Sequence, residues 1–130
     1  MTDGFLPSNN LAHLINLIKE NRNEEALAVL SDLLNQEPDS DFLLNLLGIA
    51  HKGLGNYEKA AQAFEAALKV DPQNADTLNN LSVTFIEMNN LNDALSITEQ
   101  AYAIYPNDPR LTYNRGNALA KSGQVIEGIK

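Results

Sequence analysis

The sequence predicts an all-α protein, a solenoid of about three and a half stacked helix–turn–helix repeats. Three observations lead to this fold class. Proline and alanine recur with a period of 34 residues, at Pro38, Pro72 and Pro106 and at Ala26, Ala60 and Ala94. Residue types that begin and end helices recur with the same period. Small residues recur with it too, at positions where two helices would cross. Such self-similarity is typical of arrays in which each repeat buries its apolar face against the next.

The first helix of each repeat is predicted from its start. Ser40, Asn74 and Asp108 share one phase of the period. These residue types cap helices because their side-chain oxygens accept a free amide of the first turn. Helices are therefore expected to begin directly after residues 40, 74 and 108. Pro109 fits this expectation, because a missing N–H costs nothing at the first helical position.

The end of each first helix is marked by a residue type that tolerates the left-handed conformation: Asn21, Gly55, Asn89 and Gly123. These residues come 15 positions after each cap, so each first helix is expected to span about 13 residues, or about 20 Å. A second helix follows the turn, over residues 57–70 in the clearest repeat. It should end before Asp71 and Pro72, because the residue before a proline resists the α conformation.

These signals divide the chain into an N-terminal extension, 1–6, and an array, 7–130. The repeats are 7–40, 41–74, 75–108 and a partial repeat, 109–130. The partial repeat stops within its second helix. We expect the chain to belong to a longer protein; the alternatives are that this end frays or swaps into a neighbouring molecule.

Small residues are predicted at the contacts between helices. Gly48 and Ala60 are expected at the closest crossing within the second repeat, and Ala67 should leave room for the next repeat. Larger side chains are expected to fill the core around them: Leu44, Leu47, Phe64, Leu68, Leu78, Leu81, Phe85 and Ile104.

The second repeat, DFLLNLLGIAHKGLGNYEKAAQAFEAALKVDPQN, resembles the tetratricopeptide repeat, a 34-residue helix–turn–helix with characteristic residues at fixed places. Those places hold Leu44, Leu47, Gly48, His51, Tyr57, Ala60, Phe64, Ala67 and Pro72. In the third repeat Thr98 replaces an aromatic residue, and the first repeat matches least well. The resemblance covers about residues 7–130. It implies a right-handed α-α superhelix that serves as a non-catalytic scaffold for binding proteins.

The resemblance also implies that the first helices line a concave groove. There we expect a peptide or protein segment to contact Asn45, Ile49, Lys52, Asn79, Asn80, Val83, Arg110, Tyr113, Asn114 and Asn117. The same helix faces also present Ile86, Glu87 and Lys121. Asparagine amides suit an extended backbone, and their spacing resembles the asparagine ladder of peptide-binding members. The alternative is that these asparagines are solvated helix surface. The lysine and arginine pattern of the family's carboxylate clamp is not present.

The N-terminal half of this groove is apolar, around Leu11, Ile15, Leu46 and Ile49. The patch has three interpretations: it receives a partner helix, it is covered by segment 1–8 with Phe5 and Leu6, or it pairs two copies of the chain. We favour covering or self-association, because a large bare apolar patch is unusual on a monomer.

Composition excludes several classes of function. The net charge of −8 and pI of about 4.5 argue against nucleic acid and anionic membranes as partners. The chain has no cysteine, and its start is not a signal peptide, so a cytoplasmic location is expected. His13 and His51 fall at helix-packing positions without metal-ligand spacing. We expect no metal, no cofactor and no catalysis.

The sequence therefore predicts a non-catalytic module that binds a peptide or protein segment in its groove. Two alternatives remain open: a self-association module, with the chain as a homo-oligomer, and the substrate-selecting N-terminal arm of a larger transferase.

Overall fold

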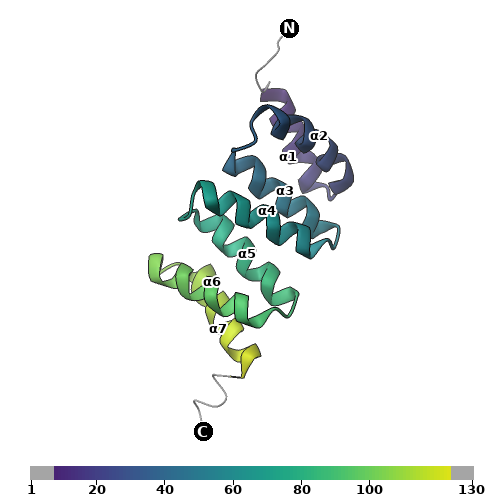
Figure 1. Ribbon diagram of the computed structural model, residues 1–130. Coiled ribbons are helices and arrows are strands. Elements are labelled where there is room, and N and C mark those ends of the chain that lie inside the picture. Colours follow the sequence, from purple (N-terminus) through teal and green to yellow (C-terminus); the bar gives the residue numbers. More distant parts are fainter. Residues whose placement is uncertain (1–7, 124–130) are drawn as a thin grey trace. The chain divides into compact units, whose positions relative to one another are not determined.

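The computed structural model describes residues 8–123, which form helices joined by short turns and contain no strand (Figure 1). The helices are α1 (Ser8–Lys19), α2 (Asn23–Gln36), α3 (Asp41–Gly53), α4 (Tyr57–Val70), α5 (Ala75–Glu87), α6 (Leu91–Ile104) and α7 (Pro109–Ser122). The predicted all-α class is confirmed. The expectations for the extension 1–6, for Phe5 and Leu6, and for a helix after Gly123 lie outside the described residues.

The predicted helix starts are confirmed by their hydrogen bonds. The Ser40 hydroxyl oxygen accepts from the amide of Leu43 at 3.2 Å, and the Asn74 side chain accepts from the amide of Thr77 at 3.1 Å. Asp108 accepts from the amide of Arg110 at 3.0 Å. Each bond satisfies a first-turn donor that has no partner within its own helix. The caps therefore fix where α3, α5 and α7 begin.

The predicted turn residues are also confirmed. Asn21, Gly55, Asn89 and Gly123 have φ angles of 60°, 80°, 59° and 85°. This is the left-handed region that glycine and asparagine enter at low cost. One period of 34 residues thus repeats a backbone conformation as well as a residue type.

The chain forms two compact units, an N-terminal unit with α1–α4 and a C-terminal unit with α5–α7, divided after Asp71. In the N-terminal unit, α1, α2 and α3 share a leucine-rich core, with Leu14 and Leu30 fully buried. Alanines are buried in this unit as well, and Ala26 and Ala60 are 0% exposed.

Gly48 is buried on α3, and its nearest neighbour differs from the one expected. A Cβ added there would lie within 2.6 Å of three atoms of the Phe64 ring. The close approach is therefore made to this ring on α4, and Ala60 is not among the nearest atoms. The ring itself is 0% exposed, so the space that glycine leaves is occupied by the aromatic side chain.

The predicted core is confirmed in part. Phe64, Leu78, Leu81 and Phe85 are buried, whereas Leu44, Leu47, Leu68 and Ile104 are only half-buried. The four residues of the expected apolar patch are partly buried in the structure. Leu11 and Leu46 pack against the N-terminal core, and Ile15 and Ile49 are half-buried.

The packing role expected for His13 was wrong, because its side chain is exposed on α1. The next residue, Leu14, points into the core instead, since neighbours on a helix face different directions. His51 is half-buried, and its Nδ1 is buried without a hydrogen-bond partner in the described structure. Burial, with a smaller contribution from the charge of Lys59, lowers the pKa of His51.

In the C-terminal unit, α6 packs against both α5 and α7, and α5 also contacts α7. Ala94, Ala101 and Ala118 are 0% exposed at these contacts. Buried hydroxyls bond back to the carbonyls one turn earlier: Ser82 to Leu78 O and Thr98 to Ala94 O, both at 2.7 Å. This satisfies their polar groups without a partner from another helix.

Candidate functional site

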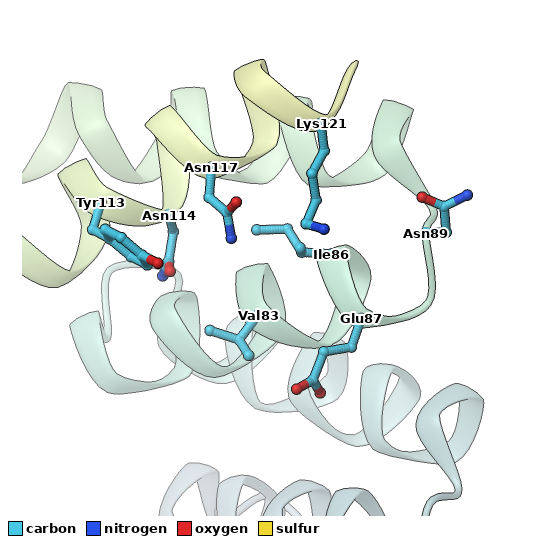
Figure 2. Close-up of a pocket in the computed structure, with 8 residues that line it drawn as sticks. All are labelled: Val83, Ile86, Glu87, Asn89, Tyr113, Asn114, Asn117 and Lys121. Carbon is cyan, nitrogen blue, oxygen red and sulfur yellow. The ribbon is translucent and has the colours of Figure 1, made fainter. Parts of the chain in front are cut away.

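A cleft of about 410 Å³ opens between α5 and α7 of the C-terminal unit (Figure 2). Its lining comes from the last turns of α5, the turn that follows, and the length of α7. The lining residues are Val83, Ile86, Glu87, Asn89, Tyr113, Asn114, Asn117 and Lys121.

Helix periodicity explains why these side chains meet. Tyr113, Asn117 and Lys121 are four residues apart on α7, so they follow one another along a single face. On α5, Val83 and Ile86 are three residues apart and share the facing side. The cleft is therefore built on two regular helices, which hold their side chains more firmly than loops do.

The cleft combines an apolar floor with an exposed aromatic ring. Ile86 is buried at 8% exposed, and Val83 is half-buried. Tyr113 is 70% exposed, the largest exposure among the large hydrophobic side chains of the described residues. An exposed tyrosine beside an apolar floor offers large contact area with a polar hydroxyl, the combination enriched at binding hot spots.

Two asparagines of the cleft have different environments. Asn114 is 4% exposed, and its Nδ2 donates to Oδ1 of Asn79 at 2.7 Å. This bond joins α7 to α5 beneath the cleft and occupies part of the hydrogen-bonding capacity of both amides. Asn117 is half-buried on the same face of α7. The accessible side-chain amides of the lining are therefore those of Asn117 and of the exposed Asn89.

Charge at the cleft is balanced. The lining contains one cation, Lys121, and one anion, Glu87. In Figure 2 the Lys121 side chain extends from α7 toward Ile86, whereas Glu87 points away from α7. The ammonium group of Lys121 is therefore the one positive charge that faces the cleft among these eight residues, and no arginine lines it.

Arg110 lies at the first turn of α7, where it is held by two carboxylates. Its guanidinium pairs with Asp76 at 2.9 Å and with Asp108 at 3.3 Å. Hydrogen bonding from Arg110 lowers the pKa of Asp108, and the bonds to the two carboxylates raise the pKa of Arg110. The charge of this arginine is thus neutralised by the cap residue of α7 and by a carboxylate of α5.

Four of the ten expected binding residues line the cleft: Val83, Tyr113, Asn114 and Asn117. Asn79 lies below it, bonded to Asn114, and Asn80 is half-buried on α5 with its carbonyl accepting from the Thr84 hydroxyl at 2.7 Å. Arg110 is outside the lining. Asn45, Ile49 and Lys52 belong to α3 of the N-terminal unit and are half-buried there.

One residue that lines the cleft was not predicted from the sequence as a binding residue. Asn89 was assigned only a turn role, and its left-handed conformation brings it to the end of α5 beside the cleft. A helical period cannot place a turn residue, so no signal in the sequence could have found it. Ile86, Glu87 and Lys121 follow from the helical period, because they extend the faces of Val83 and Asn117.

Other kinds of site find little support in the described part of the chain. Within residues 8–123 no group of three or more histidine, aspartate or glutamate side chains could hold a metal ion. None of the described helices is long and apolar enough to cross a membrane.

Comparison with known families agrees with the repeat geometry. The tetratricopeptide repeat matches this sequence twice, over residues 11–75 and 51–111. The chain belongs to the tetratricopeptide repeat family, whose fold typically serves as a protein-interaction module.

Individual relatives extend this picture. Protein O-mannosyl-transferase TMTC3 of Homo sapiens is 30% identical over 117 residues, which is 89% of this chain. The chain spans 13% and 9% of the length of the curated relatives it matches.

Solved structures agree on the fold. MamA residues 41-end from Desulfovibrio magneticus RS-1 has a TM-score of 0.83 at 25% identity, covering 94% of this chain and 69% of that one. The second tetratricopeptide domain of human RPAP3, solved in complex with an HSP70 peptide, has a TM-score of 0.77 at 15% identity. This likeness covers 84% of this chain and 91% of the RPAP3 chain, and at such identity it shows the fold alone.

Proposed function

We propose that the protein is a non-catalytic interaction module and that its C-terminal unit binds a peptide or protein segment in the α5–α7 cleft. The observation that carries this proposal is the exposed Tyr113 ring beside an apolar floor and the amide of Asn117, all on regular helices. The family fold supports it, as does the peptide complex of RPAP3, which is a property of that protein. We also propose Asn45, Ile49 and Lys52 on α3 as contacts of the same class in the N-terminal unit.

The experiment is a selection of ligands from a random peptide library displayed on phage, using the full chain as bait. Dissociation constants of the selected peptides are then measured for Tyr113→Ala and Asn117→Ala. We expect Tyr113→Ala to weaken binding at least 10-fold, because truncation of a central aromatic contact costs about 2 kcal/mol or more. Asn117→Ala should weaken it about 5-fold, since it removes one neutral hydrogen-bonding group.

Two matched controls lie outside the cleft. Tyr57→Ala removes an aromatic ring of 36% exposure at the start of α4, and Asn92→Ala removes an exposed amide on α6. Both controls should bind like the parent chain, and all four variants should keep their helicity. Selected peptides that bind the cleft variants and the parent equally would refute the proposal. Asn114→Ala is unsuitable as a binding probe, because its bond to Asn79 also supports the fold.

A second candidate function is an interaction arm of a larger transferase. The observation that favours it is the identity to TMTC3 over 89% of this chain. The test is to sequence the complete transcript that encodes these 130 residues. A transferase domain in the same reading frame would support this function, and a stop codon with no such domain would exclude it.

A further inference from the structure

We propose that the α5–α7 cleft takes an internal, uncharged stretch of a partner chain, anchored by one branched aliphatic or aromatic side chain, and not a chain terminus. This inference rests on the proposed function and specifies its ligand. Three features of the cleft carry it: the apolar floor, a single cation with no arginine beside it, and neutral side-chain amides.

The floor selects an apolar anchor. Ile86 and Val83 form it from α5, and the Tyr113 ring stands beside it from α7. A volume of about 410 Å³ is at the small end of ligand pockets, which span about 300–1,000 Å³. A short segment of extended chain fits this scale. Burial of one leucine or phenylalanine side chain there is the main source of affinity that these residues offer.

The charges select against a chain terminus. A carboxylate is bound strongly where an arginine fork or several donors converge on it. Here Lys121 is the one cation among the eight lining residues, and Glu87 lines the same cleft. The guanidinium of Arg110, at the start of α7, is already bonded to Asp76 and Asp108. A terminal carboxylate would gain little, and the net charge of −8 further opposes an acidic partner.

The amides select a neutral backbone. Asn117 offers donors and an acceptor to one peptide unit. Asn114 already donates to Asn79 and is 4% exposed, so it supports the cleft from below. Asn89, in the turn after α5, lines the same cleft, is exposed and adds a second neutral amide. A side-chain amide can fix the direction of a single peptide unit next to the anchored side chain. The rest of the ligand contributes mainly by positioning the anchoring side chain against the apolar floor.

The test uses defined probes: N-acetylated, C-amidated heptapeptides of glycine and serine with Phe, Leu, Ala or Asp at the centre. A further probe ends in a free carboxylate directly after Phe. Each is titrated into the ¹⁵N-labelled full chain, and the backbone amides of α5 and α7 and the side-chain amide of Asn117 are followed by NMR. Binding of the Phe peptide is repeated with Tyr113→Ala and Tyr57→Ala.

We expect the Phe and Leu peptides to shift cleft resonances at concentrations where the Ala and Asp peptides do not. The free carboxylate should change the dissociation constant less than 2-fold, as should Tyr57→Ala, whereas Tyr113→Ala should raise it at least 5-fold. Preferential binding of the Asp or free-carboxylate peptide, shifts centred outside the cleft, or no shift with any peptide would each overturn the inference.

The library selection separates this inference from the proposed function. Selected ligands that are acidic or require a free terminus, yet depend on Tyr113, would leave the function standing and overturn the ligand chemistry. A selection that yields no cleft ligand would remove both.

Discussion

Replacing Gly48 by alanine should destabilise the protein, although alanine is the better helix former. The added Cβ would lie within 2.6 Å of Cδ1, Cε1 and Cζ of Phe64, where ordinary contact begins at 3.4 Å. The ring must therefore withdraw by about 1 Å. It is 0% exposed, and a close-packed core has few voids into which it can move.

The magnitude follows from two opposing terms. Overpacking of a buried site costs about 1–3 kcal/mol, and we take the upper half because the obstacle is a fully buried ring. Replacing glycine by alanine within a helix stabilises the helix by about 1 kcal/mol. The free energy of unfolding should therefore fall by about 1–2 kcal/mol. With a urea slope of about 1–3 kcal/mol/M, the midpoint of unfolding should fall by about 1 M.

The matched control is Gly116→Ala. Gly116 occupies the same phase of the repeat on α7, is exposed, and has no described atom within 4 Å of an added Cβ. The same substitution should raise stability there by about 0.5–1 kcal/mol. Urea unfolding followed by circular dichroism at 222 nm measures both variants. A change of the same sign in the two, or a Gly48→Ala protein as stable as the parent, would refute the packing argument.

A second substitution checks the cause. Phe64→Leu removes Cε1 and Cζ, two of the three clashing atoms. In that background, Gly48→Ala should cost less than about 0.5 kcal/mol, because contacting residues show coupling of about 0.5–3 kcal/mol. Equal costs in the two backgrounds would assign the effect to something other than the ring.

Three further predictions concern a buried bond, a turn and a titrating group. Asn114→Ala should lower stability by about 1–2 kcal/mol, because it removes a part-buried hydrogen bond; adding Asn79→Ala should cost little more, as a double-mutant cycle in urea would show. Asn21→Ala should cost about 1 kcal/mol in the same assay because φ is 60° there, whereas Asn21→Gly should be close to neutral. Burial lowers the pKa of His51, so the folded state prefers the neutral ring. Stability is then complete above the ordinary histidine pKa of about 6.5 and is lost as the pH falls below it toward the folded pKa. Thermal unfolding from pH 7.5 to 5 should show this loss, and His51→Gln should flatten it; equal slopes in both proteins would contradict it.

The local features of the fold were predictable from the sequence. Ser40 and Asn74 cap helices through bonds to residues three positions away, and Asn89 and Gly55 turn the chain through their own φ angles. Such features depend on a few consecutive residues, and the repeat shows the caps at three places and the turn residues at four. The family then followed from the spacing of small and proline residues, and the sequence matches confirm it.

The details of the cleft were not predictable in the same way. Asn80 and Asn114 are 34 residues apart and share one phase of the repeat, whereas the hydrogen bond in the structure joins Asn114 to Asn79, one residue off that phase. The offset depends on how far α7 slides along α5, which no periodicity specifies. Arg110 bonds to Asp76, which lies 34 residues earlier in the sequence. This ion pair could not be predicted from the sequence, because it depends on the starts of α5 and α7 lying close together.

The two walls of the cleft belong to different hairpins, since α5 pairs with α6 and α7 begins the next repeat. The cleft therefore exists only while α7, the last described helix, is docked. A ligand at 100 times its dissociation constant would add about 2.7 kcal/mol to that docking. Amide hydrogen exchange along α7 would slow accordingly, so exchange in this one helix would report whether the cleft is occupied.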